Sequence, residues 1–400
     1  MTERLYYTDP YLREFDARVV RVDDVDGHRS VVLDRTAFYP TSGGQPFDMG
    51  RLGDLRVIEV IEDEDGSLRH VIEPGVAERA CQAGDTLRGI IDWDRRFDHM
   101  QQHTGQHVLS AAFDTLLEAR TESFHLGTAS STIDLRREVS PAQIARAEAD
   151  ANRIVWEDRP VAIRFADAAE AAAMPLRKES GREGQLRLID VEGYDLSACG
   201  GTHVARTGAI GIIAVASWEK FRGGSRIEFV CGGRALRAFH ALRDTTADNV
   251  RLLSVHAREI PEAIQRLQAD TKDARRRIKD LHAQLAGHEA AALADAASES
   301  RVVVRALEGW DQNGLKTIAS AICEREGYTA VLFSAPSPSA VVIARGKGAT
   351  TDAAALLKKL TENFGGKGGG RPELAQGGGL VGEAPEMVAF SRSLLGVVTS

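Results

Sequence analysis

The chain has 400 residues, 43% of them hydrophobic and 27% charged, and a formal net charge of −8 at pH 7; this length predicts two to four domains, and this composition excludes a disordered protein. The negative charge argues against a surface coated in nucleic acid, so any such contact must use local basic patches. The first residues lack the apolar stretch of a signal peptide, and no run approaches the ~20 apolar residues of a membrane helix. We therefore expect a cytoplasmic protein without membrane contact.

Residues 1–92 are predicted to form a small β-barrel-like domain. They contain five β-branched, partly alternating segments separated by turn signals, which is the pattern of short strands. These segments are 18–24, 28–34, 54–63, 68–73 and 86–92.

Residues 93–234 are predicted to form a two-layer α+β domain. A helical pattern runs from Phe97 to about Ala119, and a second helix starts at Ser140-Pro141, an N-cap followed by proline in the first turn. The strand-like segments are 131–137, 161–167, 185–195, 209–221 and 225–233.

Residues 235–298 are predicted to be a helical, coiled-coil-like spacer with a break or fresh start at Pro261. From Leu253 to Leu285 mostly apolar residues alternate spacings of four and three, a heptad pattern weakened by Thr271 and by alanines. Two interpretations stay open: a helix packed along its own protein, or a helical hairpin or dimer seam. Residues 299–400 are predicted to form a last α/β domain of alternating strands and helices.

Three histidines, His99, His103 and His107, are spaced four residues apart on the first predicted helix and share one face. Two histidines at this spacing can form half of a zinc site, although alone the pattern is a weak signal. Gly105 lies between them, and a mid-helix glycine costs about 1 kcal/mol relative to alanine. We therefore expect something to approach the backbone closely at this point.

The four cysteines are far apart and form no disulfide framework, which leaves metal ligation or ordinary burial. In "SACGGTHVA", Cys199 and His203 flank a Gly-Gly turn that can bring thiolate and imidazole together. With His103 and His107 they make a plausible tetrahedral set, so we predict one Zn²⁺ per chain. Four protein ligands are typical of a structural site; the metal could instead expand its coordination, lose one ligand, or only shape a pocket.

The loop "DRTAFYPTSGGQPFDMG", residues 34–50, combines proline and paired glycines with the polar residues Thr36, Ser42 and Gln45. Its backbone can approach a ligand closely, and these side chains can hydrogen-bond a substrate without ionising. A tight β-turn with polar decoration explains the same pattern equally well.

Together these motifs resemble a known family. "TAFYPTSGGQPFDMG", "RRFDHMQQHTGQHVLSAAF", "SFHLGTASSTIDL" and "CGGTH" are similar, in this order, to the editing domain of alanyl-tRNA synthetases and of free-standing AlaX proteins, over about residues 30–235. "GKGGGRPELAQGGG" resembles the DHHA1-like domain that follows it in those synthetases. Because the ATP-binding aminoacylation core has no room here, we expect the long AlaX form, an ATP-independent trans-editing factor.

The resemblance implies hydrolysis of the ester that joins a wrong amino acid to tRNA(Ala), chiefly serine and secondarily glycine. It places the zinc ligands at His103, His107, Cys199 and His203, and leaves His99 as a partly buried neighbour. By motif position, Thr36 is the candidate for sensing the serine hydroxyl and Gln45 for positioning the ester or the water. No carboxylate stands out as a general base, so the vicinal hydroxyl of the tRNA is expected to assist.

The glycine-rich segment near the C-terminus carries Lys367 and Arg371. Such runs are often flexible loops, but basic side chains among exposed backbone N–H groups suit a phosphate backbone. The resemblance implies tRNA binding here without catalysis, and permits a homodimer through the spacer or this domain.

Two rival functions remain: a zinc hydrolase of small esters, and a non-catalytic tRNA-binding protein with a structural zinc site. The C-terminal domain argues against the first, and the polar loop with Thr36 and Gln45 argues against the second.

Overall fold

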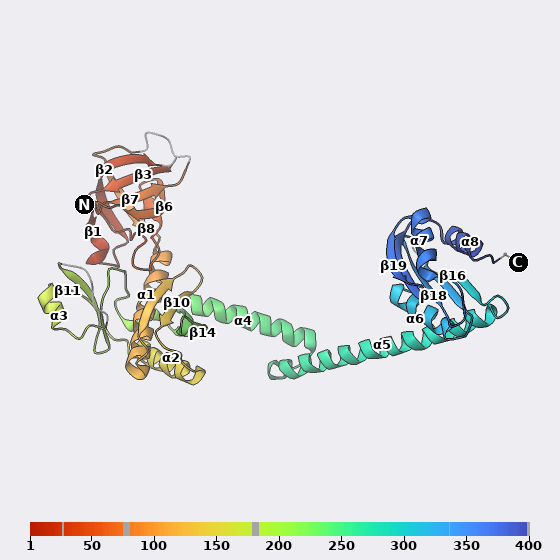
Figure 1. Ribbon diagram of the computed structural model, residues 1–400. Helices are drawn as coiled ribbons and strands as arrows, with labels where there is room; N and C mark the ends of the chain where they lie inside the picture. Colours follow the sequence, from red (N-terminus) through yellow and green to blue (C-terminus); the bar gives the residue numbers. More distant parts are fainter. Residues whose placement is uncertain (26–27, 75–80, 178–183, 336, 398–400) are drawn as a thin grey trace. The chain divides into compact units, whose positions relative to one another are not determined.

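The computed structural model describes residues 1–25, 28–74, 81–177, 184–335 and 337–397. The chain is a multidomain α+β protein that folds into two compact units, Met1–Asp248 and Asn249–Ser400 (Figure 1). No helix among the described residues combines the length and apolarity needed to cross a bilayer.

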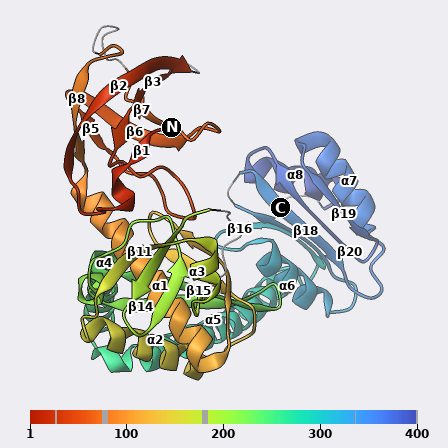
Figure 2. The ribbon, with the colours of Figure 1, turned by 90° about the vertical axis from the view of Figure 1, so that its left-hand side faces the viewer.

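The predicted N-terminal barrel is confirmed, because six strands close on themselves in the order β2-β3-β7-β6-β5-β8 (Figure 2). Alternating inward residues such as Leu55 and Val57 are buried and fill its interior. A short parallel pair, β1 (Glu3–Arg4) with β4 (Arg35–Thr36), and the 3-10 turn η1 (Leu5–Tyr7) flank it. The barrel strands are β2 (Glu14–Val25), β3 (His28–Leu33), β5 (Gly50–Leu52), β6 (Leu55–Glu62), β7 (Leu68–Ile72) and β8 (Thr86–Ile91).

Helix α1 (Trp93–Leu117) carries the histidine series and packs, with α2 (Pro141–Trp156), on a four-stranded antiparallel sheet of order β14-β15-β10-β9. It begins four residues before the predicted start, because the Asp92 carboxylate accepts a hydrogen bond from the Arg95 N–H and caps the helix there. The sheet strands are β9 (Thr121–Leu126), β10 (Ser131–Leu135), β14 (Ile213–Phe221) and β15 (Gly224–Cys231).

A separate three-stranded sheet, β11-β12-β13, leads into the Cys199 loop. Its bounds are β11 (Val161–Ala166), β12 (Leu186–Val191) and β13 (Asp195–Ala198), with the short helix α3 (Ala168–Ala172) after β11. The strand predicted from residue 209 begins only at Ile213, because Thr207–Ile210 form the 3-10 turn η2. Sequence analysis missed β9, α3 and α8 (Ala384–Leu394), the last two being short helices of 5 and 11 residues.

A buried ion pair joins the barrel to α1. Arg96 and Asp48 are both 0% exposed, and the guanidinium also donates to the carbonyl oxygens of Pro10 and Ala37. The barrel loop of residues 34–50 is therefore fixed against the helix that carries the histidines.

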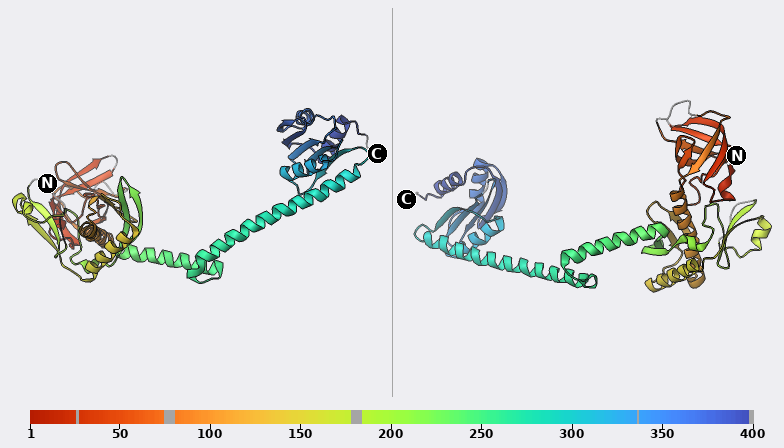
Figure 3. Two further views of the ribbon diagram at one scale, coloured as in Figure 1. Left: turned by 60° about the horizontal axis from the view of Figure 1, so that its bottom comes forward. Right: turned by 180° about the vertical axis from the view of Figure 1, so that it is seen from behind.

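The predicted spacer region contains helix α4 (Gly232–Leu253), the turn η3 (Ala257–Glu259) and helix α5 (Ile260–Ala296), with Pro261 in the first turn of α5. α5 is one continuous helix of 37 residues (Figure 3). Only its last part, including Ala286, Ala290 and Ala294, is buried against the second unit's sheet and α6.

The second unit is a three-layer sandwich around the sheet β16-β17-β18-β20-β19. α5 and α6 cover one face, and α7 and α8 cover the other. The remaining bounds are β16 (Val302–Leu307), α6 (Gln312–Cys323), β17 (Thr329–Ser334), β18 (Ser339–Arg345), α7 (Ala353–Phe364), β19 (Lys367–Arg371) and β20 (Leu374–Leu380).

The glycine-rich segment is a β-hairpin and not a flexible loop. β19 pairs antiparallel with β20, so the backbone groups on its inner side are already bonded. A Cβ at Gly370 would lie 2.3 Å from Ala375 Cα, and one at Gly377 would lie 3.0 Å from Leu357 of α7. The glycines therefore permit close packing of the hairpin.

Candidate metal centre

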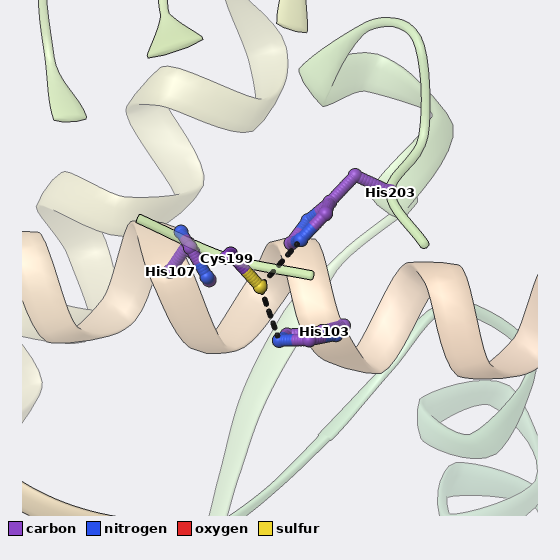
Figure 4. A group of neighbouring side chains, drawn as sticks. All are labelled: His103, His107, Cys199 and His203. Carbon is purple, nitrogen blue, oxygen red and sulfur yellow. Dashed lines mark hydrogen bonds between the residues drawn. The ribbon is translucent and has the colours of Figure 1, made fainter. Parts of the chain in front are cut away.

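Four side chains converge in the first unit: His103 and His107 from α1, and Cys199 and His203 from the loop after β13 (Figure 4). One ligand atom from each lies within 4.8 Å of the others. Cys199 Sγ is 3.4 Å from His103 Nε2 and 3.3 Å from His203 Nε2. Three buried imidazoles and a partly buried cysteine in this arrangement can hold a metal ion.

Each histidine is oriented through its other ring nitrogen. His103 Nδ1 lies 2.8 Å from Gln45 Oε1, and His107 Nδ1 lies 3.1 Å from Asp195 Oδ2. His203 Nδ1 lies 3.2 Å from Thr104 Oγ1. Because Gln45 Oε1 and Asp195 Oδ2 accept from an Nδ1–H, they leave the Nε2 lone pairs of His103 and His107 directed at the cluster, as in histidine metal sites.

Three groups of the cluster have shifted pKa values, and burial holds the pKa of His203 well below its usual value. Burial lowers the pKa of His107, but the hydrogen bonds to Asp195 and Cys199 outweigh it and raise the pKa overall. Burial raises the pKa of the Cys199 thiol, but the neighbouring His103 and His203 hold it well below its usual value. The lowered pKa favours the thiolate of Cys199, which is the form that binds metal.

The Cys199 loop is held from β12. The Arg187 guanidinium donates through Nη1 to the carbonyl oxygens of Cys199 and Gly201, and through Nε to the carbonyl of Tyr7. A Cβ at Gly201 would lie 2.2 Å from His103 Cε1, so only glycine allows the loop to approach this ring so closely.

Glycine at position 105 is explained by packing and not by a bound ligand. A Cβ there would lie 2.3 Å from Cys231 Sγ of β15. Gly105 thus brings α1 against the sheet, which confirms the expected close approach and identifies the approaching group as Cys231.

A cavity of about 570 Å³ opens beside the cluster. His107, Cys199 and the Gly200-Gly201 turn form one part of its wall. The other lining residues are aromatic, polar and basic: Arg4, Tyr6, Tyr7, Tyr39, Ser42, Gly43, Gln106, Thr121, Glu122, Ser123, Phe124, Arg177, Gln185, Leu186, Arg187, Ser197 and Ala198. This composition suits a ligand with aromatic and oxygen-rich parts.

Gln45 and Thr36 occupy different surroundings, although both are 0% exposed. Gln45 lies at the cluster, where its amide oxygen also accepts the Thr202 N–H. Thr36 does not line the cavity. Burial lowers the pKa of His70 to about 4, and its Nδ1–H donates to the Val31 carbonyl. His70 Nε2 is therefore an acceptor. It accepts a hydrogen bond from the Thr36 hydroxyl, with Oγ1 and Nε2 2.9 Å apart.

The other predicted residues lie apart from the cluster. His99 is 2% exposed, more buried than expected, and its Nδ1 has no partner among the residues the structure describes. Lys367 and Arg371 are exposed at the two ends of edge strand β19 in the second unit. No signal in the sequence pointed to Asp195, Thr104 or Arg187, because their contacts join distant parts of the chain. Asp195 and Thr104 are 88 and 99 residues from the histidines that they contact. Arg187 contacts one partner 12 residues away and another 180 residues away.

Two known domain families match this chain. Residues 186–228 match the threonyl and alanyl tRNA synthetase second additional domain, which includes Cys199 and His203. Residues 299–396 match the DHHA1 domain.

The whole chain also has curated relatives. It is 31% identical to the alanyl-tRNA editing protein AlaX-L of Pyrococcus horikoshii, over 94% of each chain. It is 33% identical to the alanine–tRNA ligase of Pyrococcus abyssi, over 94% of this chain but only 42% of the ligase. Among solved structures, the C-Ala domain of Aquifex aeolicus alanyl-tRNA synthetase aligns at 24% identity and a TM-score of 0.21, over 24% of this chain and 86% of that one.

Proposed function

Since the chain belongs to the family of the alanyl-tRNA editing protein AlaX-L, we propose that it is an aminoacyl-tRNA deacylase that acts in trans on mischarged tRNA(Ala) in the cytoplasm. Its substrate is chiefly Ser-tRNA(Ala), with Gly-tRNA(Ala) second. The proposal rests mainly on one observation: three buried histidines and a partly buried cysteine converge beside a cavity.

The donor set fits Zn²⁺, which would be held by His103, His107, Cys199 and His203. Three neutral imidazoles and one thiolate are ligands that zinc prefers, and each ring has its orienting partner. When bound, Zn²⁺ supplies a Lewis acid that polarises an ester carbonyl or a water.

The chain's own groups position the substrate. Gln45 fixes the His103 ring and so acts as a positioning residue. The Arg187 guanidinium lines the cavity beside Cys199 and can donate to an ester or ribose oxygen of the aminoacyl-adenosine. Among the described residues, the one carboxylate of the cavity lining is Glu122, which is exposed. The vicinal hydroxyl of the tRNA is therefore our candidate for proton transfer.

The second unit supplies tRNA affinity. Lys367 and Arg371 are exposed on β19, and exposed basic side chains contact phosphates without reading sequence. We assign them to tRNA binding and assign no catalysis to this unit.

Deacylation of Ser-tRNA(Ala), followed as loss of labelled serine, tests the proposal. The protein is compared with its Cys199→Ala variant and with Cys323→Ala, a matched cysteine in the second unit. We expect the first variant to lose both zinc and activity and the second to keep both. Full activity in a zinc-free Cys199→Ala protein would contradict the proposal.

The same experiment separates the two rivals. A zinc-replete protein that binds tRNA(Ala) without cleaving its ester is a binding module. A protein that hydrolyses small activated esters but not Ser-tRNA(Ala) is a small-ester hydrolase.

A further inference from the structure

Two buried polar atoms on the cavity wall lack a partner among the residues that the structure describes: Gln106 Oε1 and Arg187 Nη2. Other polar wall groups are engaged, for example the Tyr39 hydroxyl with the Ser42 carbonyl and Ser197 with Asp195. An unpaired buried polar atom is unfavourable, and at a binding site the substrate is the natural partner.

The two atoms need different partners, because one is a hydrogen-bond donor and the other an acceptor. A guanidinium N–H only donates, so Arg187 suits oxygens that every aminoacyl-tRNA has: the ester carbonyl, the ribose hydroxyls and the phosphate. An amide oxygen only accepts, so Gln106 needs a group that donates. The hydroxyl of a seryl group donates, and the methyl group of alanine does not.

Gln106 is also held in place. It is 3% exposed, it lies on α1 next to His107, and its Nε2 donates to Ser110 Oγ at 2.8 Å. Ser110 Oγ in turn accepts from Thr121 Oγ1 at 2.8 Å. In this network Nε2 of Gln106 contacts Ser110, and Oε1 is the atom without a partner among the described residues.

We propose that Gln106 Oε1 accepts the hydrogen bond of the seryl hydroxyl and so sets the preference for serine over alanine. This inference rests on the proposed function and adds its specificity residue. Alanine leaves the buried oxygen unpaired, and a site of this kind rejects the analogue that lacks the hydroxyl. Thr36, the candidate from motif position, already donates its hydroxyl proton to His70.

The test uses the full-length, zinc-loaded protein and its Gln106→Met variant, which keeps the side-chain length and loses the acceptor. Deacylation rates of Ser-tRNA(Ala), Gly-tRNA(Ala) and Ala-tRNA(Ala) are measured, together with zinc content. We expect the serine-to-alanine rate ratio to fall by about fivefold or more, as for loss of one buried hydrogen bond, with glycine unaffected. Equal losses on all three substrates would overturn the inference, because Gln106 would then bind the shared α-ammonium.

Thr36→Val serves as the rival variant. We expect it to keep the native ratio of serine to alanine deacylation rates. A lower ratio in Thr36→Val but not in Gln106→Met would assign recognition of the seryl hydroxyl to Thr36 instead.

Binding gives a readout independent of catalysis. Non-hydrolysable seryl and alanyl amides of 3′-amino-3′-deoxyadenosine are titrated against both proteins. The native protein should prefer the seryl amide and Gln106→Met should not. A protein that shows this preference but does not deacylate would refute the proposed function and leave the Gln106 inference standing; no preference in the native protein would refute the inference.

Discussion

The histidine rings of the cluster are oriented by residues from three different parts of the chain. Spacing predicted that a histidine pair and the CxxxH pair would meet, because HxxxH is local to one helix turn and CxxxH to one loop. The family resemblance then selected His103 and His107 from the three histidines. The partners of the Nδ1 atoms could not be predicted this way. Gln45 is 58 residues from His103, and Asp195 is 88 residues from His107. Only the folded barrel loop and β13 bring these groups together.

Removing the amide of Gln45 should weaken metal binding. Gln45→Met leaves His103 Nδ1 without its partner, and loss of such a contact typically costs 10- to 100-fold in metal affinity, so we expect about that loss here. Competition with a chromophoric zinc chelator measures it. Ser42→Ala, on the same loop, is the control; an unchanged zinc affinity in Gln45→Met would exclude the positioning role.

The buried His70 should make the barrel sensitive to acid. Its pKa is lowered by burial from 6.5 to about 4, so the unfolded chain takes up a proton between these pH values and the folded chain does not. Stability from this group is therefore complete above pH 6.5 and is lost as the pH falls towards 4. The loss at pH 5 is about 2 kcal/mol.

Urea unfolding of the native protein and of His70→Gln at pH 7 and pH 5 measures this effect. The native protein should lose about 2 kcal/mol more than the variant between the two pH values. Equal losses would show that His70 is not held neutral.

At the scale of elements, strands and amphipathic helices with a clear apolar period could be predicted from the sequence. Elements without such a period could not. Periodicity located α1, α2 and five of the six barrel strands, missing the three-residue β5. The start of α1 was misplaced because the Asp92 cap lies before the apolar pattern. The glycine-rich hairpin β19–β20 was misjudged because glycine has low strand propensity. Its strands form because β20 pairs with β18 and packs on α7, and these are tertiary contacts.

The contact between Gly105 and Cys231 should control the packing of α1 on β15. Gly105→Ala places a Cβ 2.3 Å from Cys231 Sγ, and overpacking of this kind costs about 1–3 kcal/mol despite the better helix propensity of alanine. Thermal or urea unfolding measures the change.

A Cys231→Ala background removes the sulfur that causes this clash. Gly105→Ala should cost much less there than in the native chain, which a double-mutant cycle quantifies. The same cost in both backgrounds would show that the strain lies elsewhere.

At the scale of the whole molecule, we propose that the chain divides chemistry from tRNA affinity. The first unit holds the cluster and the cavity, and the second holds the exposed basic residues of β19. The homodimer remains a prediction. Helix α5 exposes apolar heptad positions, since Ile278, Leu281 and Leu285 are each more than half exposed. Comparing the sedimentation of Leu281→Glu with that of the native protein tests whether these positions form a dimer seam.

Charge removal on β19 should weaken tRNA binding without changing the chemical step. For Lys367→Ala combined with Arg371→Ala we expect a higher KM, an unchanged kcat and a shallower salt dependence, by about one to two units of slope. Lys358→Ala with Lys359→Ala on α7 is the charge-matched control. A fall in kcat at an unchanged KM would contradict the assignment.

The measurement that tests the account most directly is deacylation of Ser-tRNA(Ala), Gly-tRNA(Ala) and Ala-tRNA(Ala) by one preparation of known zinc content. We expect one zinc per chain, rapid loss of serine, slower loss of glycine and retention of alanine. Retention of all three by a zinc-replete protein that binds tRNA(Ala) would contradict it and would make the metal centre a structural one.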